Sequence, residues 1–351
     1  MVALLGTLLV LALAAHLVCV NVAATAPLIA IYLDRRGRRK PDPLARELGY
    51  ALGRYAWWGI GVGGGLGIVC GLLMAGLPYA RWFAALGRIP DYRLHWLAAE
   101  LVVYLLLLLP FTWRGRWHDS LPWLRYLCGV LAATNLLYHF PPMFAILSVI
   151  SSDPAWIDVT IDRRQFHRLM LDPAIVSRTL HHWFAATATI GMLTAWLAWR
   201  SRGGESQAAS ATKLVRIGAG VALVATLMQI PTGLWFLLTY PPAAQGSFLG
   251  GDLAATGLLG VSVVLSVGLL HHLAMITLGD VRRTPLIVAT ALLLTIIVCM
   301  SAALHRGRHL DYLREAPRIT SAFDSYGCKS TQINGLFEQK ATEKTENRNL
   351  C

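Results

Sequence analysis

Long apolar runs recur along the whole chain, with short polar segments between them. A run of about twenty apolar residues matches the thickness of the bilayer core when it forms an α-helix, because the helix satisfies its own backbone groups. The pattern therefore predicts an all-α fold, a polytopic membrane bundle of about eight helices. The expected helices cover roughly residues 3–33, 51–76, 94–113, 122–150, 174–200, 214–239, 252–278 and 285–305.

Two polar stretches stand outside this pattern. Residues 151–173 are rich in Asp and Arg, and we expect them to form the one sizeable loop. From Ala316 onward the hydrophobicity gives way to Ser, Thr, Lys, Glu, Asn and Gln, a composition typical of weakly ordered segments. We therefore expect two parts, a transmembrane bundle over residues 1–310 and a poorly ordered polar tail over residues 311–351.

Composition agrees with a membrane protein, since 56% of the residues are hydrophobic, 14% are charged and the formal net charge is +12. In a soluble protein this charge would suggest nucleic acid, but here most Lys and Arg lie in short segments between apolar runs, where they set topology. The bilayer is the expected partner, and nucleic acid is not. The loops after alternate runs, beginning with the Arg-rich residues 35–46, carry a moderate excess of basic residues, which predicts both termini on the outer side.

Two further features limit the class of protein. The six cysteines form no CxxC or CxxCH pattern, so the ligand spacing of structural zinc, iron–sulfur clusters and covalently attached haem is missing. The apolar part of residues 1–33 is too long for a signal peptide and lacks a basic start, so we expect it to be the first span.

Ionisable residues inside apolar spans are the candidate functional groups, because such residues are costly in lipid and usually face a cavity or a cofactor. Histidine dominates them, with few carboxylates and no lysine. This balance favours haem b over an ion pathway. The candidates are His16, Glu100, His139, His181, His182, His271 and His272.

The strongest candidate lies near a clear helix start. Asp172 followed by Pro173 predicts an N-cap and a proline at the first helical position. His181 is then about two turns inside the helix, and consecutive helical positions point about 100° apart, so His182 faces elsewhere. We expect His181 to bind iron, although a histidine satisfied by a neighbouring backbone is the plainer alternative.

The remaining candidates each have two interpretations. His16 either binds iron or bonds a neighbouring backbone. His139 either binds iron or satisfies carbonyls left free where Pro141 and Pro142 break the helix. Glu100 either relays protons or pairs with an interfacial arginine such as Arg93.

Gln229 lies beside Pro231, within the sixth apolar run. Its amide either holds a quinone carbonyl or reseals the backbone at the proline kink. The glycine-rich residues 61–67 lie inside a span, where close helix packing explains them better than phosphate binding.

Pro173, with a histidine eight residues on, resembles subunit I of the cytochrome bd quinol oxidases, whose fifth helix carries its low-spin haem b histidine at that spacing. His16, Glu100 and Ser152-Asp-Pro154 follow the family order of a haem histidine, a proton-path glutamate and an Asn-Pro. The resemblance covers residues 1–200. It implies haem b, possible quinol binding, respiratory or cytochrome partner subunits, and the bacterial inner membrane.

The chain also departs from that family. Only residues 240–251 join the sixth and seventh runs, where the family has a long quinol-binding loop, and the second ligand of the low-spin haem is missing. The resemblance therefore implies a shortened b-type cytochrome that passes electrons from a quinol or donor cytochrome to a partner docked at residues 151–173. His139 is the best candidate opposite His181. The alternatives are a cofactor-free proton-coupled transporter or sensor, and a structural subunit of a respiratory complex.

Overall fold

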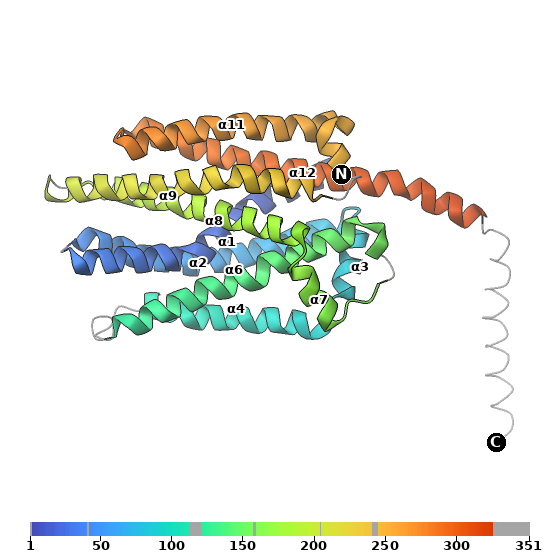
Figure 1. Ribbon diagram of the computed structural model, residues 1–351, viewed down its shortest axis with the longest axis horizontal. Coiled ribbons are helices and arrows are strands. Elements are labelled where there is room, and N and C mark those ends of the chain that lie inside the picture. The colour runs from blue at the N-terminus through green and yellow to red at the C-terminus, as the bar shows by residue number, and fades with distance from the viewer. Residues whose placement is uncertain are drawn as a thin grey trace, which may run out of the picture. The chain divides into compact units, whose positions relative to one another are not determined.

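The computed structural model describes the chain over residues 2–40, 42–112, 121–156, 159–203, 205–240 and 245–325, and the regular structure in these ranges is helical. Long helices lie alongside one another as a bundle (Figure 1). The first half of the chain forms α1 (Val2–Arg39), α2 (Pro43–Ala75), α3 (Ala80–Arg88), α4 (Asp91–Thr112), α6 (Pro122–Ser152) and the short η1 (Pro154–Trp156). The second half forms α7 (Arg163–Met170), α8 (Pro173–Arg200), α9 (Glu205–Leu238), η2 (Ser247–Gly251), α11 (Leu253–Leu278) and α12 (Arg283–Ser325).

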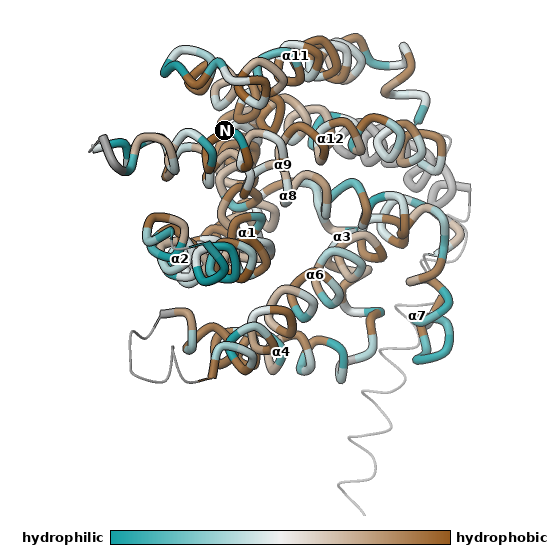
Figure 2. The backbone as a smooth tube through the Cα atoms, turned by 60° about the vertical axis from the view of Figure 1, so that its left-hand side comes forward, coloured by the Kyte–Doolittle hydropathy of each residue, from teal (hydrophilic) through white to brown (hydrophobic). Residues whose placement is uncertain are grey.

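The expected polytopic helical bundle is confirmed. Seven of the described helices are long and apolar enough to cross a membrane, namely α1, α2, α4, α6, α9, α11 and the Arg283–Gly307 part of α12. The eighth expected span is α8, which has 28 residues but is less apolar, since it carries His181, His182 and Arg178. Figure 2 shows the apolar character of the long helices and the more polar character of α7.

The chain divides into two units, Met1–Gly307 and Arg308–Cys351. Helix α12 continues to Ser325, so the backbone of the first part of the expected tail is helical. The rest of that tail, residues 326–351, lies outside the described residues. So do residues 113–120, which include the expected end of the third span.

Helix α8 begins where the sequence predicts. Asp172 is its N-cap, and the Asp172 carboxylate accepts a hydrogen bond of 2.8 Å from the backbone N–H of Ala174, with Pro173 at the first position. An N-cap of this kind satisfies an N–H group that has no partner within the helix. Three other aspartates cap helices in the same way: Asp42 on α2, Asp162 on α7 and Asp252 on α11.

The expected break at Pro141 and Pro142 is wrong, because α6 runs unbroken through both prolines. Pro141 lacks the N–H that would bond the carbonyl of Leu137. The indole Nε1 of Trp183, on α8, donates a hydrogen bond of 3.0 Å to that carbonyl instead. The freed carbonyl was predicted correctly, but a neighbouring helix satisfies it and the helix continues.

Residues 151–173 are more than a loop, which corrects the sequence expectation. They contain η1 and α7, and the α7 side chains of Phe166 and Leu169 are buried. Phe166 and Leu169 pack in an apolar cluster with Ala85 on α3 and Ile89 beside it. The α7 part of the segment therefore packs on the bundle and presents a structured surface.

Glycines set the close approach of neighbouring helices. A Cβ atom on Gly59 of α2 would lie 2.8 Å from the carbonyl oxygen of Cys19 on α1, and one on Gly63 would lie 2.9 Å from Val20. Gly61, by contrast, faces open space. Within residues 61–67, Gly63 and Gly67 thus fit the helix-packing interpretation, whereas Gly61, Gly64 and Gly65 meet open space.

Candidate functional site

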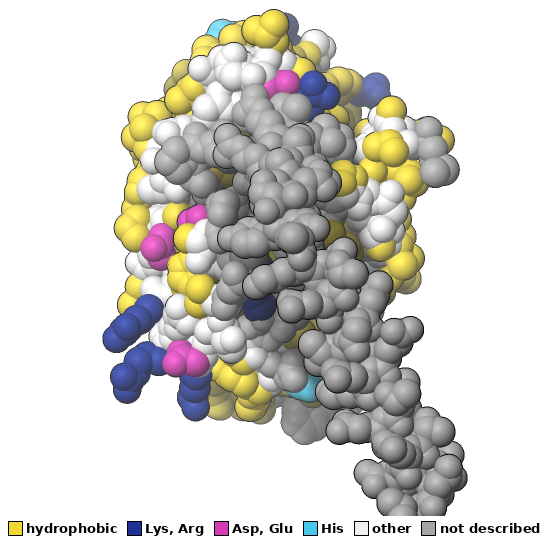
Figure 3. All heavy atoms as spheres, turned by 90° about the vertical axis from the view of Figure 1, so that its right-hand side faces the viewer, with side chains coloured by type: hydrophobic (Ala, Val, Ile, Leu, Met, Phe, Trp, Pro, Cys, Tyr) yellow, Lys and Arg dark blue, Asp and Glu magenta, His cyan; other side chains and the backbone are white. Residues whose placement is uncertain are grey.

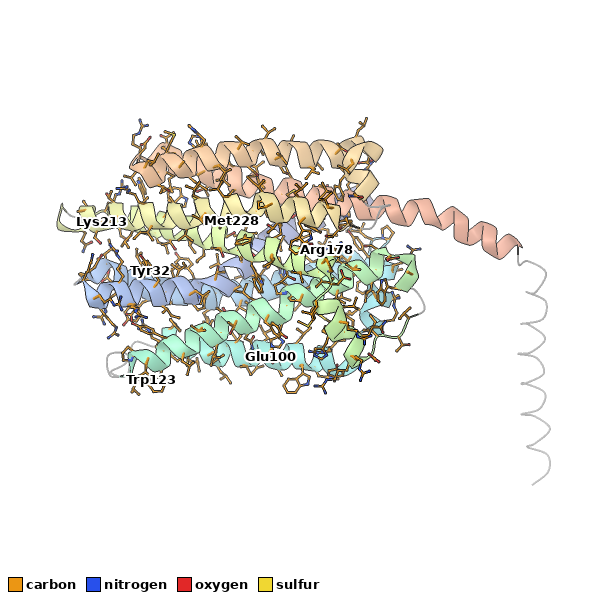
Figure 4. All side chains as sticks on the ribbon, in the orientation of Figure 1. Tyr32, Glu100, Trp123, Arg178, Lys213 and Met228 are labelled. Atoms are coloured by element: carbon orange, nitrogen blue, oxygen red, sulfur yellow. The ribbon has the colours of Figure 1, made fainter. Side chains whose placement is uncertain are left out.

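Glu100 and His139 form a polar pair between α4 and α6. The Oε1 atom of Glu100 lies 3.5 Å from Nε2 of His139, and its other carboxylate oxygen accepts a hydrogen bond from the side-chain amide of Asn135. Both side chains are mostly buried, with 19% of Glu100 and 29% of His139 exposed. Figure 4 marks Glu100 on α4, alongside α6.

Arg93, the expected alternative partner of Glu100, makes other contacts. One terminal guanidinium nitrogen of Arg93 lies 2.7 Å from Nε2 of His167, and its Cζ lies 4.5 Å from the centre of the Phe166 ring. Arg93 therefore ties α4 to α7. Among the described contacts, Glu100 engages Asn135 and His139 instead.

A small cavity of about 20 Å³ lies beside His139. That volume suits about one water molecule when polar groups are at hand. The imidazole of His139 and the guanidinium of Arg93 supply polar groups, so water could approach the Glu100–His139 pair here. The lining residues are Arg93, Trp96, Leu97, Tyr138, His139, Met143, Phe166 and Met170.

His16 lies between α1 and α2, and its ring has a defined hydrogen bond. Its Nδ1 atom is 2.7 Å from the carbonyl oxygen of Gly63. A carbonyl can only accept, so a neutral His16 carries its proton on Nδ1 and keeps a lone pair on Nε2. The ring also lies against Gly67, where an added Cβ atom would come within 3.0 Å of Cε1.

His181 lies between α8 and α9 in a similar arrangement. A Cβ atom on Gly233 would come within 3.2 Å of its Cε1 atom, so this glycine lets the ring lie close to α9. The ring centre is 6.0 Å from that of Phe236, and the main chain of Gln229 lies close by. Nδ1 of His181 is buried and has no hydrogen-bond partner among the described residues. Gln229, the expected quinone contact, thus lies beside His181.

Histidines on α1 and α8 lie within electrostatic range of one another inside the bundle. His182 lies close enough to both His16 and His181 for their charges to interact when protonated. Imidazole is the usual protein ligand of haem b iron. The free Nε2 of His16 fits that donor chemistry, and His181 presents a buried ring beside the Gln229 backbone, although no group of three or more metal-binding side chains occurs among the described residues.

The other candidate histidines make contacts elsewhere in the bundle. His271 and His272 are neighbours on α11 with ring centres 5.3 Å apart. His305 on α12, which was not among the candidates, has its Nδ1 atom 2.7 Å from the hydroxyl of Tyr79. His139, expected opposite His181, uses its Nε2 atom toward Glu100.

One buried charged residue beside His181 was missed from the sequence. Arg178, labelled on α8 in Figure 4, is 7% exposed and lies one turn before His181. It donates a 2.7 Å hydrogen bond to the hydroxyl of Ser148, and its Cζ lies 4.5 Å from the Tyr240 ring and 5.0 Å from the Phe236 ring. It stands among polar residues at the helix start, so hydropathy alone did not mark it as buried.

A second missed cluster surrounds Asp34 near the end of α1. Its buried carboxylate lies 2.8 Å from a guanidinium nitrogen of Arg125 and 2.9 Å from Nε of Arg38. The hydroxyl of Tyr126 donates a hydrogen bond of 2.8 Å to the same carboxylate. Asp34 was not listed as a residue inside a span because the hydropathy pattern ended the first helix at residue 33, whereas α1 continues to Arg39.

Comparisons with known proteins identify a similar fold. No protein-family model matches the chain, and no curated protein matches it. A similar solved structure is that of the bd oxidase from Geobacillus thermodenitrificans, with a TM-score of 0.63 and 16% identity over 88% of this chain and 87% of that chain. The likeness extends beyond residues 1–200, where the sequence resemblance lay. The chain thus has a cytochrome bd-like fold, and its haem and quinol remain predictions.

Proposed function

We propose that this chain is a membrane-bound b-type cytochrome that transfers electrons between a quinol or donor cytochrome and a redox partner. The observation that carries the proposal is that His182 of α8 lies within electrostatic range of both His16 on α1 and His181, inside a bd-like bundle. Histidines are costly among membrane helices and gather where a cofactor or cavity compensates. The proposed setting is the bacterial inner membrane, with both termini on the outer side and other respiratory subunits as partners.

In this proposal His16 and His181 hold haem b iron. When bound, the haem supplies reversible one-electron chemistry at its iron. The hydrogen bond from Nδ1 of His16 to the Gly63 carbonyl orients that ring and leaves Nε2 available as the donor atom. Gly67 and Gly233 leave room for the two rings between the helices.

Glu100 and His139 serve as the proton-handling pair. A carboxylate and an imidazole in contact can exchange a proton, and the cavity beside His139 gives water access to the pair. His139 could act as an iron ligand only if its Nε2 left Glu100, so we assign it to the proton pair. Gln229, beside His181, is the proposed contact for a quinone carbonyl, and residues 151–173 are the proposed docking surface.

Optical spectra of the purified protein test the haem proposal. We expect a reducible b-type Soret band, and loss of a low-spin component in both His181→Ala and His16→Ala. His271→Ala is the matched control, because it removes an intramembrane histidine from α11 and should leave the spectrum intact. The proposal is wrong if the wild-type protein has no b-type band, or if the spectrum is the same in wild type and in both variants.

The Glu100–His139 pair also favours a second candidate function, a cofactor-free transporter or sensor coupled to protons. This candidate expects no haem. It also expects a pH-dependent activity that changes in Glu100→Gln and in His139→Gln. Haem analysis of the wild-type protein distinguishes the two candidates before any variant is made.

A further inference from the structure

The end of α8 meets the start of α12 around Trp199. Just past the end of α8, Arg202 donates a 3.0 Å hydrogen bond from Nη1 to the carbonyl oxygen of Val281. The Cζ atom of Arg202 is 6.0 Å from the Trp199 ring centre, and that of Arg283 is 5.9 Å from it. Two guanidinium groups, one just after α8 and one at the start of α12, therefore lie near one indole.

The guanidinium of Arg202 uses one of its nitrogen atoms in a hydrogen bond and leaves two others without one. With Nη1 bonded to Val281, its Nε and Nη2 atoms are buried and have no hydrogen-bond partner among the described residues. These two atoms form the side-on fork that binds carboxylate and phosphate oxygens in pairs. Burial also lowers the pKa of Arg202, a cost that a bound anion would offset.

The nearby carboxylate is already engaged. Asp280 accepts two hydrogen bonds of 2.6 Å from Arg282, one from Nε and one from Nη2, which neutralises that pair. Arg202 and Arg283 are left as two positive charges beside Trp199. The charge balance at this point therefore favours an anionic ligand.

The depth of the cluster indicates where that anion would come from. The apolar span of α12 begins at Arg283, and Trp199 lies in the last turn of α8. Tryptophan and arginine are typical of the level at which lipid headgroups lie. Figure 3 shows the bundle from the opposite end, where apolar side chains lie along both margins of the described surface.

We propose that Trp199, Arg202 and Arg283 form a binding site for the phosphate of an anionic phospholipid headgroup. Arg202 supplies the fork, Arg283 supplies a second charge, and the indole of Trp199 lies at the headgroup–acyl boundary. This site is separate from the histidine group and does not depend on haem.

Native mass spectrometry of the detergent-purified full chain tests this site. The probes are phosphatidylglycerol and phosphatidylcholine with the same acyl chains, titrated separately. We expect tighter binding of phosphatidylglycerol, weakened roughly fivefold in Arg283→Ala, since one basic residue contributes about 1 kcal/mol at a membrane surface. Arg202→Lys keeps the charge but loses the fork, and should also weaken phosphatidylglycerol binding.

The matched control is Arg216→Ala, which removes an exposed arginine that likewise bonds a backbone carbonyl, that of Thr277. It should bind phosphatidylglycerol like wild type. The site is overturned if the two lipids bind equally, or if Arg283→Ala, which removes an exposed side chain, binds phosphatidylglycerol like the control. Displacement of phosphatidylglycerol by millimolar inorganic phosphate would overturn the lipid as ligand and assign the site to free phosphate.

Discussion

Oε1 of Glu100 lies 3.5 Å from Nε2 of His139, joining the two intramembrane groups that the sequence suggested for separate roles. The pair lies between α4 and α6, with Asn135 holding the second carboxylate oxygen. A carboxylate that bonds both an amide and an imidazole is oriented on both sides. That orientation suits proton exchange better than a chance interfacial contact does.

Glu100→Gln should slow proton-coupled electron transfer while leaving haem in place. Glutamine keeps the size and an oxygen that accepts from the Asn135 amide but cannot take up or release a proton, and positioned proton transfer contributes about 100-fold or more to rate. The measurement is the quinol oxidation rate alongside the haem spectrum. Glu47→Gln, an exposed change on α2, is the control. An unchanged rate in Glu100→Gln would remove Glu100 from the proton path.

Trp183→Phe should destabilise the protein by about 1–3 kcal/mol. The substitution leaves the Leu137 carbonyl without a donor next to Pro141, and an unsatisfied buried polar group costs about that much. Chemical unfolding in detergent measures the change. Trp123→Phe, which changes a tryptophan on α6 that is 60% exposed, should have little effect. Equal effects of the two changes would show that the hydrogen bond is unimportant.

Much of the fold could be predicted because membrane helices leave a strong pattern. The apolar runs located the long helices, and Asp172-Pro173 located the start of α8. The pattern was weaker for α7, whose buried Phe166 and Leu169 are spaced among charged residues. Short amphipathic helices bury few side chains, so tertiary packing rather than hydropathy determines them.

The site was only partly predictable, for a different reason. Sequence position identified His16, Glu100, His139 and His181 as costly polar groups, but pairing depends on which helices become neighbours. The contact of His139 with Glu100 follows from α4 packing on α6, which hydropathy does not encode. Asp34 was missed because charge at a span end is usually solvated.

Acid should reduce the contribution of Asp252 to stability. Its pKa lies below the usual range, because its carboxylate accepts the N–H of Ala255 and also pairs with Arg306 at 3.2 Å. With the folded pKa below the unfolded value of about 3.9, the contribution is fully present above that value and is lost as pH falls through the folded pKa.

The gap in melting temperature between wild type and Asp252→Asn should therefore narrow as pH falls from about 6 to about 3. Thermal melts across that range measure it. Arg306→Ala, which keeps the helix cap but removes the ion pair, should show a smaller gap with the same trend. A gap independent of pH would contradict the role of the ionised carboxylate.

Adding a side chain at Gly191, where α8 crosses α9, should destabilise the protein. A Cβ atom there would lie 2.7 Å from both the backbone N of Ala222 and the carbonyl oxygen of Gly218, and backbone cannot move aside as a flexible side chain can. Gly191→Ala must therefore push the helices apart, at a cost of about 1–3 kcal/mol for overpacking. The same displacement would move Gly233 away from the ring of His181.

Thermal unfolding in detergent should thus show a lower midpoint for Gly191→Ala than for wild type, with an altered haem spectrum if His181 binds iron. Gly61→Ala is the matched control, because a Cβ atom there meets open space. Alanine in a helix is more favourable than glycine by up to about 1 kcal/mol, so the control should be neutral or slightly stabilising. If Gly191→Ala is as stable as Gly61→Ala, the close contact between α8 and α9 is not what holds the histidine-bearing helix in place.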